Sequence, residues 1–145
     1  MNIFQLPYEA RLQSWYDLRT QLSGSDTQTK CIEIDKWWQN APLVNHHLHI
    51  LDQDNWPDPW ELLVENTYCY VARALGMCYT LSLLDIADIE LVEATDSQGD
   101  DVVLVLVDNA KYILNYHPNT VISNKQTNFH IKRNVNITKT ITTIG

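Results

Sequence analysis

The sequence lacks a hydrophobic run long enough to cross a bilayer. Its longest uninterrupted apolar stretch, Val102 to Val107, falls far short of the roughly 20 residues that a membrane helix needs. No basic residue followed by an apolar segment opens the chain, so we expect no secretory signal. Cysteine is scarce and odd in number, with three residues, which favours reduced thiols and synthesis in the cytoplasm. These absences argue against a membrane protein and a secreted disulfide scaffold.

Glycine-rich nucleotide motifs are also missing. The 145 residues contain four glycines and no phosphate loop, GxSxG motif or dinucleotide fingerprint, and we predict no cofactor.

Positive charge is scarce before residue 117. Residues 1–116 hold all eighteen acids and six of the ten bases, a formal charge of −12, whereas residues 117–145 carry +4. An acidic body repels phosphate, so nucleic acid is an unlikely partner, and no membrane is expected.

Helical spacing dominates the first half of the chain. Apolar residues recur at three- and four-residue intervals in Pro7–Leu22, and a second helix capped by Ser25 or Asp26 is expected to end before Pro42. Residues 41–58 show no period and predict an irregular crossing. Asp58-Pro59-Trp60-Glu61 is typical of a helix start, and Thr67–Leu84 is apolar enough to be a central buried helix.

After Asp88 the hydrophobic period becomes that of strands. Strands are predicted at 89–94, 101–107 and 111–116, with Val121-Ile122 as a short addition. The predicted fold is α+β: N-terminal helices and a central helix packed on a small antiparallel sheet. Residues 1–122 form one domain in this interpretation, and residues 123–145 form an extended C-terminal β arm.

Cys69 is the residue that most clearly suggests chemistry. It lies near the start of the predicted central helix, where free N–H groups and the helix dipole favour a reactive thiol. The segments Asn66–Met77 and Gly99–Asn119 resemble the nucleophile helix and the two core strands of transglutaminase-like and papain-like thiol enzymes. The resemblance implies a catalytic His at the start of the first strand and an orienting Asp at the end of the second.

Two positions depart from that pattern. Asp101 or Val102 stands where the resemblance expects His, and Asn115 stands where it expects Asp. An imidazole is the group that takes the thiol proton and later protonates the leaving group. His117 follows Asn115 on the second strand, so a rearranged site of Cys69, Asp101, Asn115 and His117 stays open. The more economical interpretation is that Cys69 is a small buried hydrophobe.

A second group of polar residues falls in the irregular crossing. His47 and His49 would face the same way on a strand and are weak candidates for metal ligands, with His46, Asp52 and Asp54 nearby. No cysteine pair or HExxH motif accompanies them, so a partly exposed polar crossing is the preferred interpretation, and no metal is predicted.

Tryptophan is dense in the segments Trp37-Trp38 and Trp56–Trp60. We interpret these rings as core, with part of their surface covered by another subunit. The segments Trp56–Leu63 and Asn66–Cys69, followed by a small sheet, are similar to small proteins of contractile-tailed bacteriophages. That resemblance implies a non-catalytic structural or assembly component of the head–tail, tail or baseplate region, located in the virion. The alternative is a cysteine-dependent enzyme of amide chemistry that uses Cys69.

The C-terminal arm is the predicted partner-binding segment. Its residues alternate as a strand and carry bases without an acid, which suits strand addition to an acidic neighbour, either a second copy or another particle component. The predicted contact residues are Phe129, Ile131, Lys132, Arg133, Val135, Ile137 and Lys139.

Overall fold

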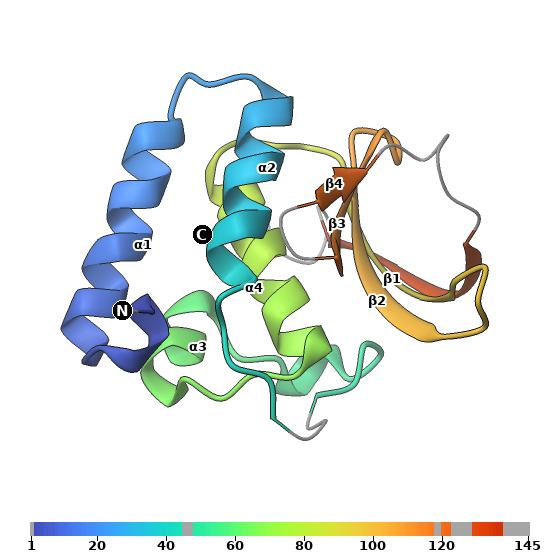
Figure 1. The fold of residues 1–145 in the computed structure, drawn as a ribbon, viewed down its shortest axis with the longest axis horizontal. Coiled ribbons are helices and arrows are strands. Elements are labelled where there is room, and N and C mark those ends of the chain that lie inside the picture. The colour runs from blue at the N-terminus through green and yellow to red at the C-terminus, as the bar shows by residue number, and fades with distance from the viewer. Residues whose placement is uncertain (1, 45–47, 118–119, 123–128, 138–145) are drawn as a thin grey trace.

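The computed structural model describes residues 2–44, 48–117, 120–122 and 129–137, and it has the predicted α+β architecture. Four α-helices lie on one side of a single sheet (Figure 1). The helices are α1 (Tyr8–Leu22), α2 (Thr27–Trp38), α3 (Pro59–Glu65) and α4 (Tyr70–Leu83), with short 3-10 turns η1 (Ile3–Gln5) and η2 (Gln53–Asn55). Within the described residues, no helix has the length and hydrophobicity that a membrane crossing requires.

Local capping chemistry fixes the starts of α2 and α3. The Asp26 carboxylate accepts the Thr29 backbone N–H at 2.7 Å, as one of the two predicted caps. Asp58 and Glu61 form a reciprocal capping box, with Pro59 in the first turn where its missing N–H costs no hydrogen bond.

The central helix begins later than its hydrophobic pattern predicts. Asn66 ends α3 in the left-handed region with φ 54°, and Tyr68 then pairs in parallel with Leu43. Cys69 has an extended backbone and occupies the N-cap position of α4. The helix therefore starts at Tyr70 rather than Thr67. Tertiary pairing of residues 66–69 overrides their helical spacing, and it leaves Cys69 at the true N-terminus of the helix.

The sheet is antiparallel with strand order β4-β3-β2-β1-β5. Its strands are β1 (Ile89–Thr95), β2 (Asp101–Val107), β3 (Tyr112–His117), β4 (Thr120–Ile122) and β5 (His130–Asn136). The predicted meander of the first three strands is confirmed, with Leu91 opposite Val105 and Leu106 opposite Ile113.

The C-terminal segment joins this same sheet. β5 pairs antiparallel with β1, with Leu91 opposite Val135, so residues 130–136 form an edge strand of the domain's own sheet. The predicted arm is therefore part of the body over its described length. Val135 and Ile137 are buried, at 7% and 0% exposure, because they cover the chain's own core.

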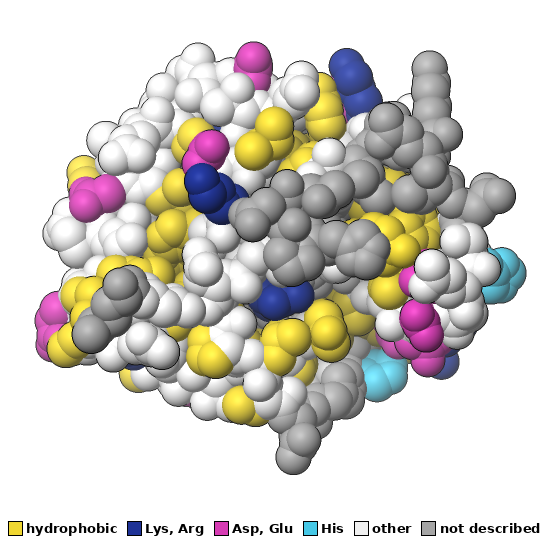
Figure 2. All heavy atoms as spheres, in the orientation of Figure 1, with side chains coloured by type: hydrophobic (Ala, Val, Ile, Leu, Met, Phe, Trp, Pro, Cys, Tyr) yellow, Lys and Arg dark blue, Asp and Glu magenta, His cyan; other side chains and the backbone are white. Residues whose placement is uncertain are grey.

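The main core lies between the helices and one face of the sheet. The predicted core residues Leu75, Leu81, Leu104, Leu106 and Ile113 are all buried. A smaller cluster on the other face of the sheet includes Leu104, Leu106 and Ile113, so β2 is buried on both faces as predicted. On the face shown in Figure 2, some hydrophobic side chains stay exposed among polar ones over the helices.

Helix α2 packs closely against α4 at Gly76. A Cβ at Gly76 would lie 2.6 Å from a ring carbon of Trp38, which is itself fully buried. Only glycine lets the indole ring lie against the α4 backbone at this point.

We expect Gly76→Ala to lower the free energy of unfolding by about 1–3 kcal/mol, because the methyl group overpacks the Trp38 contact. Alanine normally stabilises a helix interior relative to glycine by about 1 kcal/mol, so the sign of the change is diagnostic. Urea denaturation of this variant beside Ser82→Ala, a change within the same helix but away from the contact, measures it. A Gly76→Ala protein more stable than the wild type would refute the close contact.

Candidate functional site

Cys69 lies at the N-terminus of the most buried helix. Its backbone is extended, its carbonyl accepts the Arg73 N–H at 3.0 Å, and no side chain caps the first turn of α4. The side chain is only 3% exposed. The thiol therefore has the polar helix end beside it but little access to solvent.

The other cysteines are chemically quiet. Burial raises the pKa of Cys31 to about 12, with the carboxylates of Asp108 and Asp35 adding to the effect. Burial also raises the pKa of Cys78, which lies within α4. Because the thiolate is the nucleophile, neither of these two thiols is poised to react near neutral pH.

Asn115 stands where the resemblance expects the orienting acid, and its side chain makes three hydrogen bonds within the chain. The amide Nδ2 donates to the Tyr70 carbonyl at 3.2 Å and to the Val103 carbonyl at 3.0 Å. Its Oδ1 accepts the Arg73 Nε–H at 2.9 Å. The residue is 2% exposed and sits at φ 67°, so it joins the start of α4 to β2 and β3.

A buried carboxylate that the sequence did not single out accepts a hydrogen bond from the Asn115 backbone. Asp35 of α2 accepts the Asn115 backbone N–H at 2.8 Å and the Gln39 amide at 3.3 Å through one oxygen. Its other oxygen is buried and has no hydrogen-bond partner within the described residues. Burial raises the pKa of Asp35, while the Asn115 and Gln39 hydrogen bonds and the Arg73 charge oppose the shift.

Arg73 completes this network. It is 6% exposed, and its guanidinium lies 5.3 Å from the centre of the Tyr70 ring. Burial lowers its pKa, and the nearby Tyr70 and Asp35 oppose that change. The pattern that could have revealed the pair is a charge on an apolar helix face: Asp35 falls between Cys31 and Trp38, and Arg73 is the one charge in the α4 segment.

A cleft opens beside the start of α4. Its volume is about 190 Å³, and the side chains around it come from α4, the first three residues of β2, the loop before η2, β1 and β5. They are His49, Ile50, Tyr70, Val71, Glu93, Ala94, Asp101, Val102, Val103 and Lys132. The floor is mainly aliphatic and the rim carries charges of both signs.

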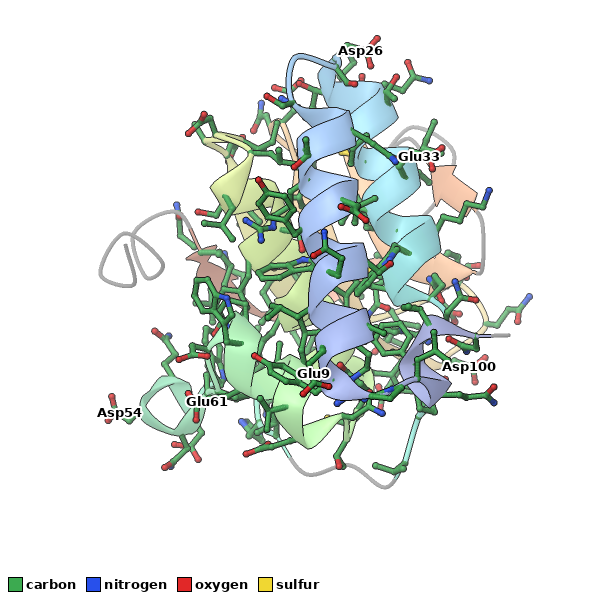
Figure 3. All side chains as sticks on the ribbon, turned by 90° about the vertical axis from the view of Figure 1, so that its left-hand side faces the viewer. Glu9, Asp26, Glu33, Asp54, Glu61 and Asp100 are labelled. Atoms are coloured by element: carbon green, nitrogen blue, oxygen red, sulfur yellow. The ribbon has the colours of Figure 1, made fainter. Side chains whose placement is uncertain are left out.

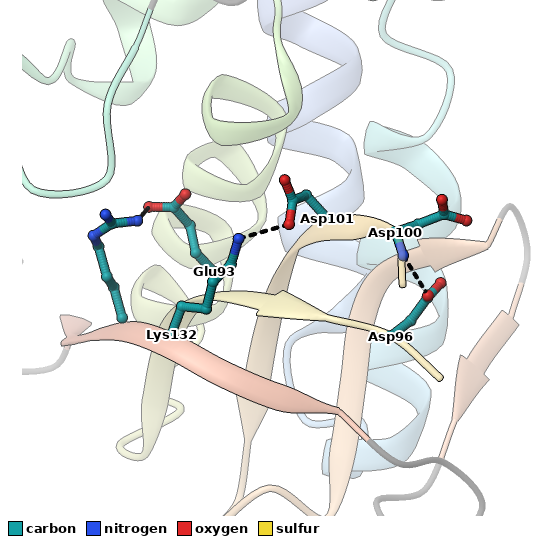
Figure 4. Close-up of polar contacts among 6 residues, drawn as sticks. Glu93, Asp96, Asp100, Asp101 and Lys132 are labelled. Carbon is teal, nitrogen blue, oxygen red and sulfur yellow. Dashed lines mark hydrogen bonds and ion pairs between the residues drawn. The ribbon is translucent and has the colours of Figure 1, made fainter. Parts of the chain in front are cut away.

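The rim charges are paired with one another (Figure 4). Lys132 of β5 lies 2.6 Å from Asp101, and Arg133 lies 3.3 Å from Glu93. The hydrogen bond and charge of Lys132 lower the pKa of Asp101, so Asp101 is an anion at neutral pH and no substitute for an imidazole base. Both pairs are partly exposed and contribute little to stability.

The described histidine at the cleft is His49. Its Nδ1 accepts the Leu51 N–H at 3.1 Å, so in the neutral ring the proton is on Nε2. That tautomer donates a hydrogen bond from Nε2 rather than taking a proton there. Within the described residues, no hydrogen bond joins an imidazole to Cys69. His46, His47 and the side chain of His117 lie outside what the structure describes.

Of the two weak metal candidates, the structure describes only His49, since His47 lies outside the described residues. No group of three or more His, Cys, Asp and Glu side chains suitable for a metal occurs in the described parts of the chain.

The predicted partner contacts have different surroundings. Phe129 packs edge-on against Tyr116 at 5.1 Å, and Ile131 is 48% exposed. Val135 and Ile137 are buried in the chain's own core, and Lys139 lies outside the described residues. That these residues contact a partner stays a prediction.

The arrangement of helix, cysteine and strands is that of a known class of folds. No family model and no curated protein matches the sequence. The solved structures do match, and they have the fold of transglutaminase-like and papain-like cysteine proteases. Among them is Legionella pneumophila LapG, with 12% identity, 89% of this chain and 74% of that chain covered, and a TM-score of 0.71.

Two further LapG structures agree. The EGTA-treated form gives the same values, and the calcium-bound form covers 84% of this chain and 71% of that one at 12% identity and a TM-score of 0.65. At this identity the likeness establishes the fold alone. It agrees with the transglutaminase-like resemblance of the sequence, and these comparisons give no support to a role in a phage particle.

The pKa of Asp35 yields a pH test. Because burial raises its folded-state pKa above that of the unfolded chain, its contribution to stability is present at low pH and is lost as pH rises through the folded-state pKa. Relative to Asp35→Asn, the wild type should gain stability as pH falls from 7 toward about 4, the ordinary carboxyl pKa. Urea denaturation across this range measures the difference. A flat profile for Asp35→Asn would contradict the burial argument.

Proposed function

We propose that the chain is a non-catalytic binding domain on a transglutaminase-like fold, and that the cleft beside α4 receives a segment of a protein partner. The observation that carries this proposal is that the cleft is present while the groups expected to activate the thiol are engaged elsewhere. Asp101 is paired with Lys132, and the Asn115 side chain holds α4 to the sheet.

Thiol catalysis needs a proton acceptor close to the sulfur and later a proton donor to the leaving group. His49 presents an Nε2–H in its neutral form, and Asn115 already uses both amide hydrogens and accepts from Arg73. Cys69 is also nearly enclosed, at 3% exposure. Among the described residues, a substrate carbonyl therefore meets neither an accessible sulfur nor a positioned base.

Binding makes smaller demands, and the cleft meets them. Its volume of about 190 Å³ suits a single side chain, and its lining of Ile50, Val71 and Val103 suits an aliphatic one. The charged rim supplies polar contacts for a backbone on either side. An extended segment with a Leu-like side chain between polar neighbours is the ligand that this lining favours.

A second candidate function is cysteine-dependent amide chemistry at Cys69. Two observations favour it: the thiol sits at the N-terminus of α4, and the fold is shared with LapG. It requires a base from outside the groups discussed above. Membership of a phage particle, with the partner another virion component, stays a prediction from the sequence.

Turnover separates the two candidates. We expect no Cys69-dependent incorporation of dansylcadaverine into casein and no Cys69-dependent casein hydrolysis, because no described side chain is placed as a base for the nearly enclosed thiol. Iodoacetamide should label Cys69 much more slowly in the folded protein than in the denatured chain. Cys69→Ala and Cys78→Ala are the matched variants. Activity that disappears in Cys69→Ala and persists in Cys78→Ala would establish the second candidate instead.

Binding is tested with two blocked tripeptides, acetyl-Ala-Leu-Ala-amide and acetyl-Ala-Asp-Ala-amide. The leucine peptide should give saturable shifts of the Val71 and Val103 amide resonances, and the aspartate peptide should not, because only leucine matches the aliphatic lining. Val103→Trp, which fills the cleft, should abolish the shifts while leaving the rest of the spectrum in place. Equal shifts with both peptides, or shifts that survive Val103→Trp, would exclude the cleft as the binding site.

A further inference from the structure

The outer side of α1 and α3 carries large hydrophobic side chains that the fold does not bury. Tyr16 and Val64 are each 55% exposed, and Trp60 is 42% exposed. Trp60 stands edge-on against the buried Trp15, with ring centres 5.9 Å apart. Figure 3 looks onto this side, with α1 in front.

Arg19 links these rings into one surface. Its guanidinium carbon lies 4.0 Å from the centre of the Trp15 ring and 5.7 Å from that of Tyr16. We call Tyr16, Arg19, Trp60 and Val64 the aromatic patch. Tryptophan, tyrosine and arginine are the residues that contribute most binding energy in protein interfaces, and exposed groups of them commonly mark such interfaces.

The aromatic patch contains one unsatisfied hydrogen-bond donor among the described residues, the Arg19 Nε–H. This atom is buried and has no hydrogen-bond acceptor within the described residues. A buried donor without an acceptor costs free energy, and although no partner reaches this enclosed atom, a partner carboxylate can pair with the part of the half-buried Arg19 cation that faces solvent. The patch is therefore suited to a partner that offers an acidic side chain beside apolar ones.

We propose that the occupant is a second copy of this chain, joined at the aromatic patch about a twofold axis. A twofold interface must be complementary to itself, so each copy needs both the cation and a carboxylate. The same side of the molecule provides both, since Glu9 of α1 and Glu61 of α3 are exposed there (Figure 3). Arg19 of one copy then pairs with a carboxylate of the other, while Trp60 and Tyr16 bury apolar surface.

This surface replaces the C-terminal arm as the site of self-association. β5 already pairs with β1, and its bases Lys132 and Arg133 already face Asp101 and Glu93 of the same chain. Among the residues that the structure describes, Arg19 Nε has no such internal partner. The inference is independent of the proposed function, because no residue of the patch lines the cleft.

Sedimentation equilibrium of the full chain from about 1 to 200 µM tests the proposal. The wild type should dimerise in this range, and Tyr16→Ser and Arg19→Gln should each raise the dissociation constant at least about tenfold, as interface hot spots do. Tyr70→Ser is the matched control, because Tyr70 is 54% exposed but lies at the cleft. Circular dichroism verifies that each variant is folded.

Each outcome decides the matter. Dimerisation weakened by Tyr16→Ser and Arg19→Gln but not by Tyr70→Ser supports the aromatic patch. A monomeric wild type at 200 µM overturns the proposal. So does a dimer that the two patch variants leave intact, or one that Tyr70→Ser disrupts equally. Val64→Glu changes an exposed residue of the aromatic patch, so it should also weaken dimerisation while leaving the core unchanged.

Discussion

The contact between Trp38 and Gly76 sets the position of the helices around α4. One turn beyond Gly76, the Thr80 hydroxyl accepts the indole N–H of Trp38 at 3.0 Å and that of Trp15 at 2.9 Å, and it donates to the Gly76 carbonyl at 2.7 Å. One buried oxygen thereby satisfies two buried indoles from α1 and α2. Since an unsatisfied indole donor would cost about 1–3 kcal/mol, the three helices are held in one arrangement.

A second set of contacts fixes the sheet to this helical unit. Asp35, Arg73 and Asn115 connect α2, α4 and β3 through hydrogen bonds that are buried. The same connection gives the Asn115 side chain a structural role. A side chain that orients an imidazole needs an oxygen that accepts the ring N–H. The Asn115 Oδ1 instead accepts the Arg73 Nε–H. The position has a structural task, and that task competes with the catalytic one.

The sequence predicted those parts of the fold that depend on local patterns. The caps at Asp26 and Asp58, the apolar α4 and the alternation of β1 to β3 are all read within about ten neighbouring residues. The pairing of Tyr68 with Leu43 and of β5 with β1 joins distant segments, and no local period reports it. The Cys69 position was recognisable from sequence, but the commitment of Asn115 was not, because its partners lie 12 to 80 residues away.

Two bases of the C-terminal segment pair with acids of their own chain and not, as the sequence predicts, with a partner. Lys132 and Arg133 meet acids of their own sheet, and such exposed pairs are worth only about 0–1 kcal/mol, so the burial of Val135 and Ile137 is what anchors β5. The two surfaces proposed for partners, the cleft and the aromatic patch, share no residue. A dimer joined at the patch keeps both clefts open. A partner that carries the recognised segment twice would be held by both copies, and its second contact would form at high effective concentration.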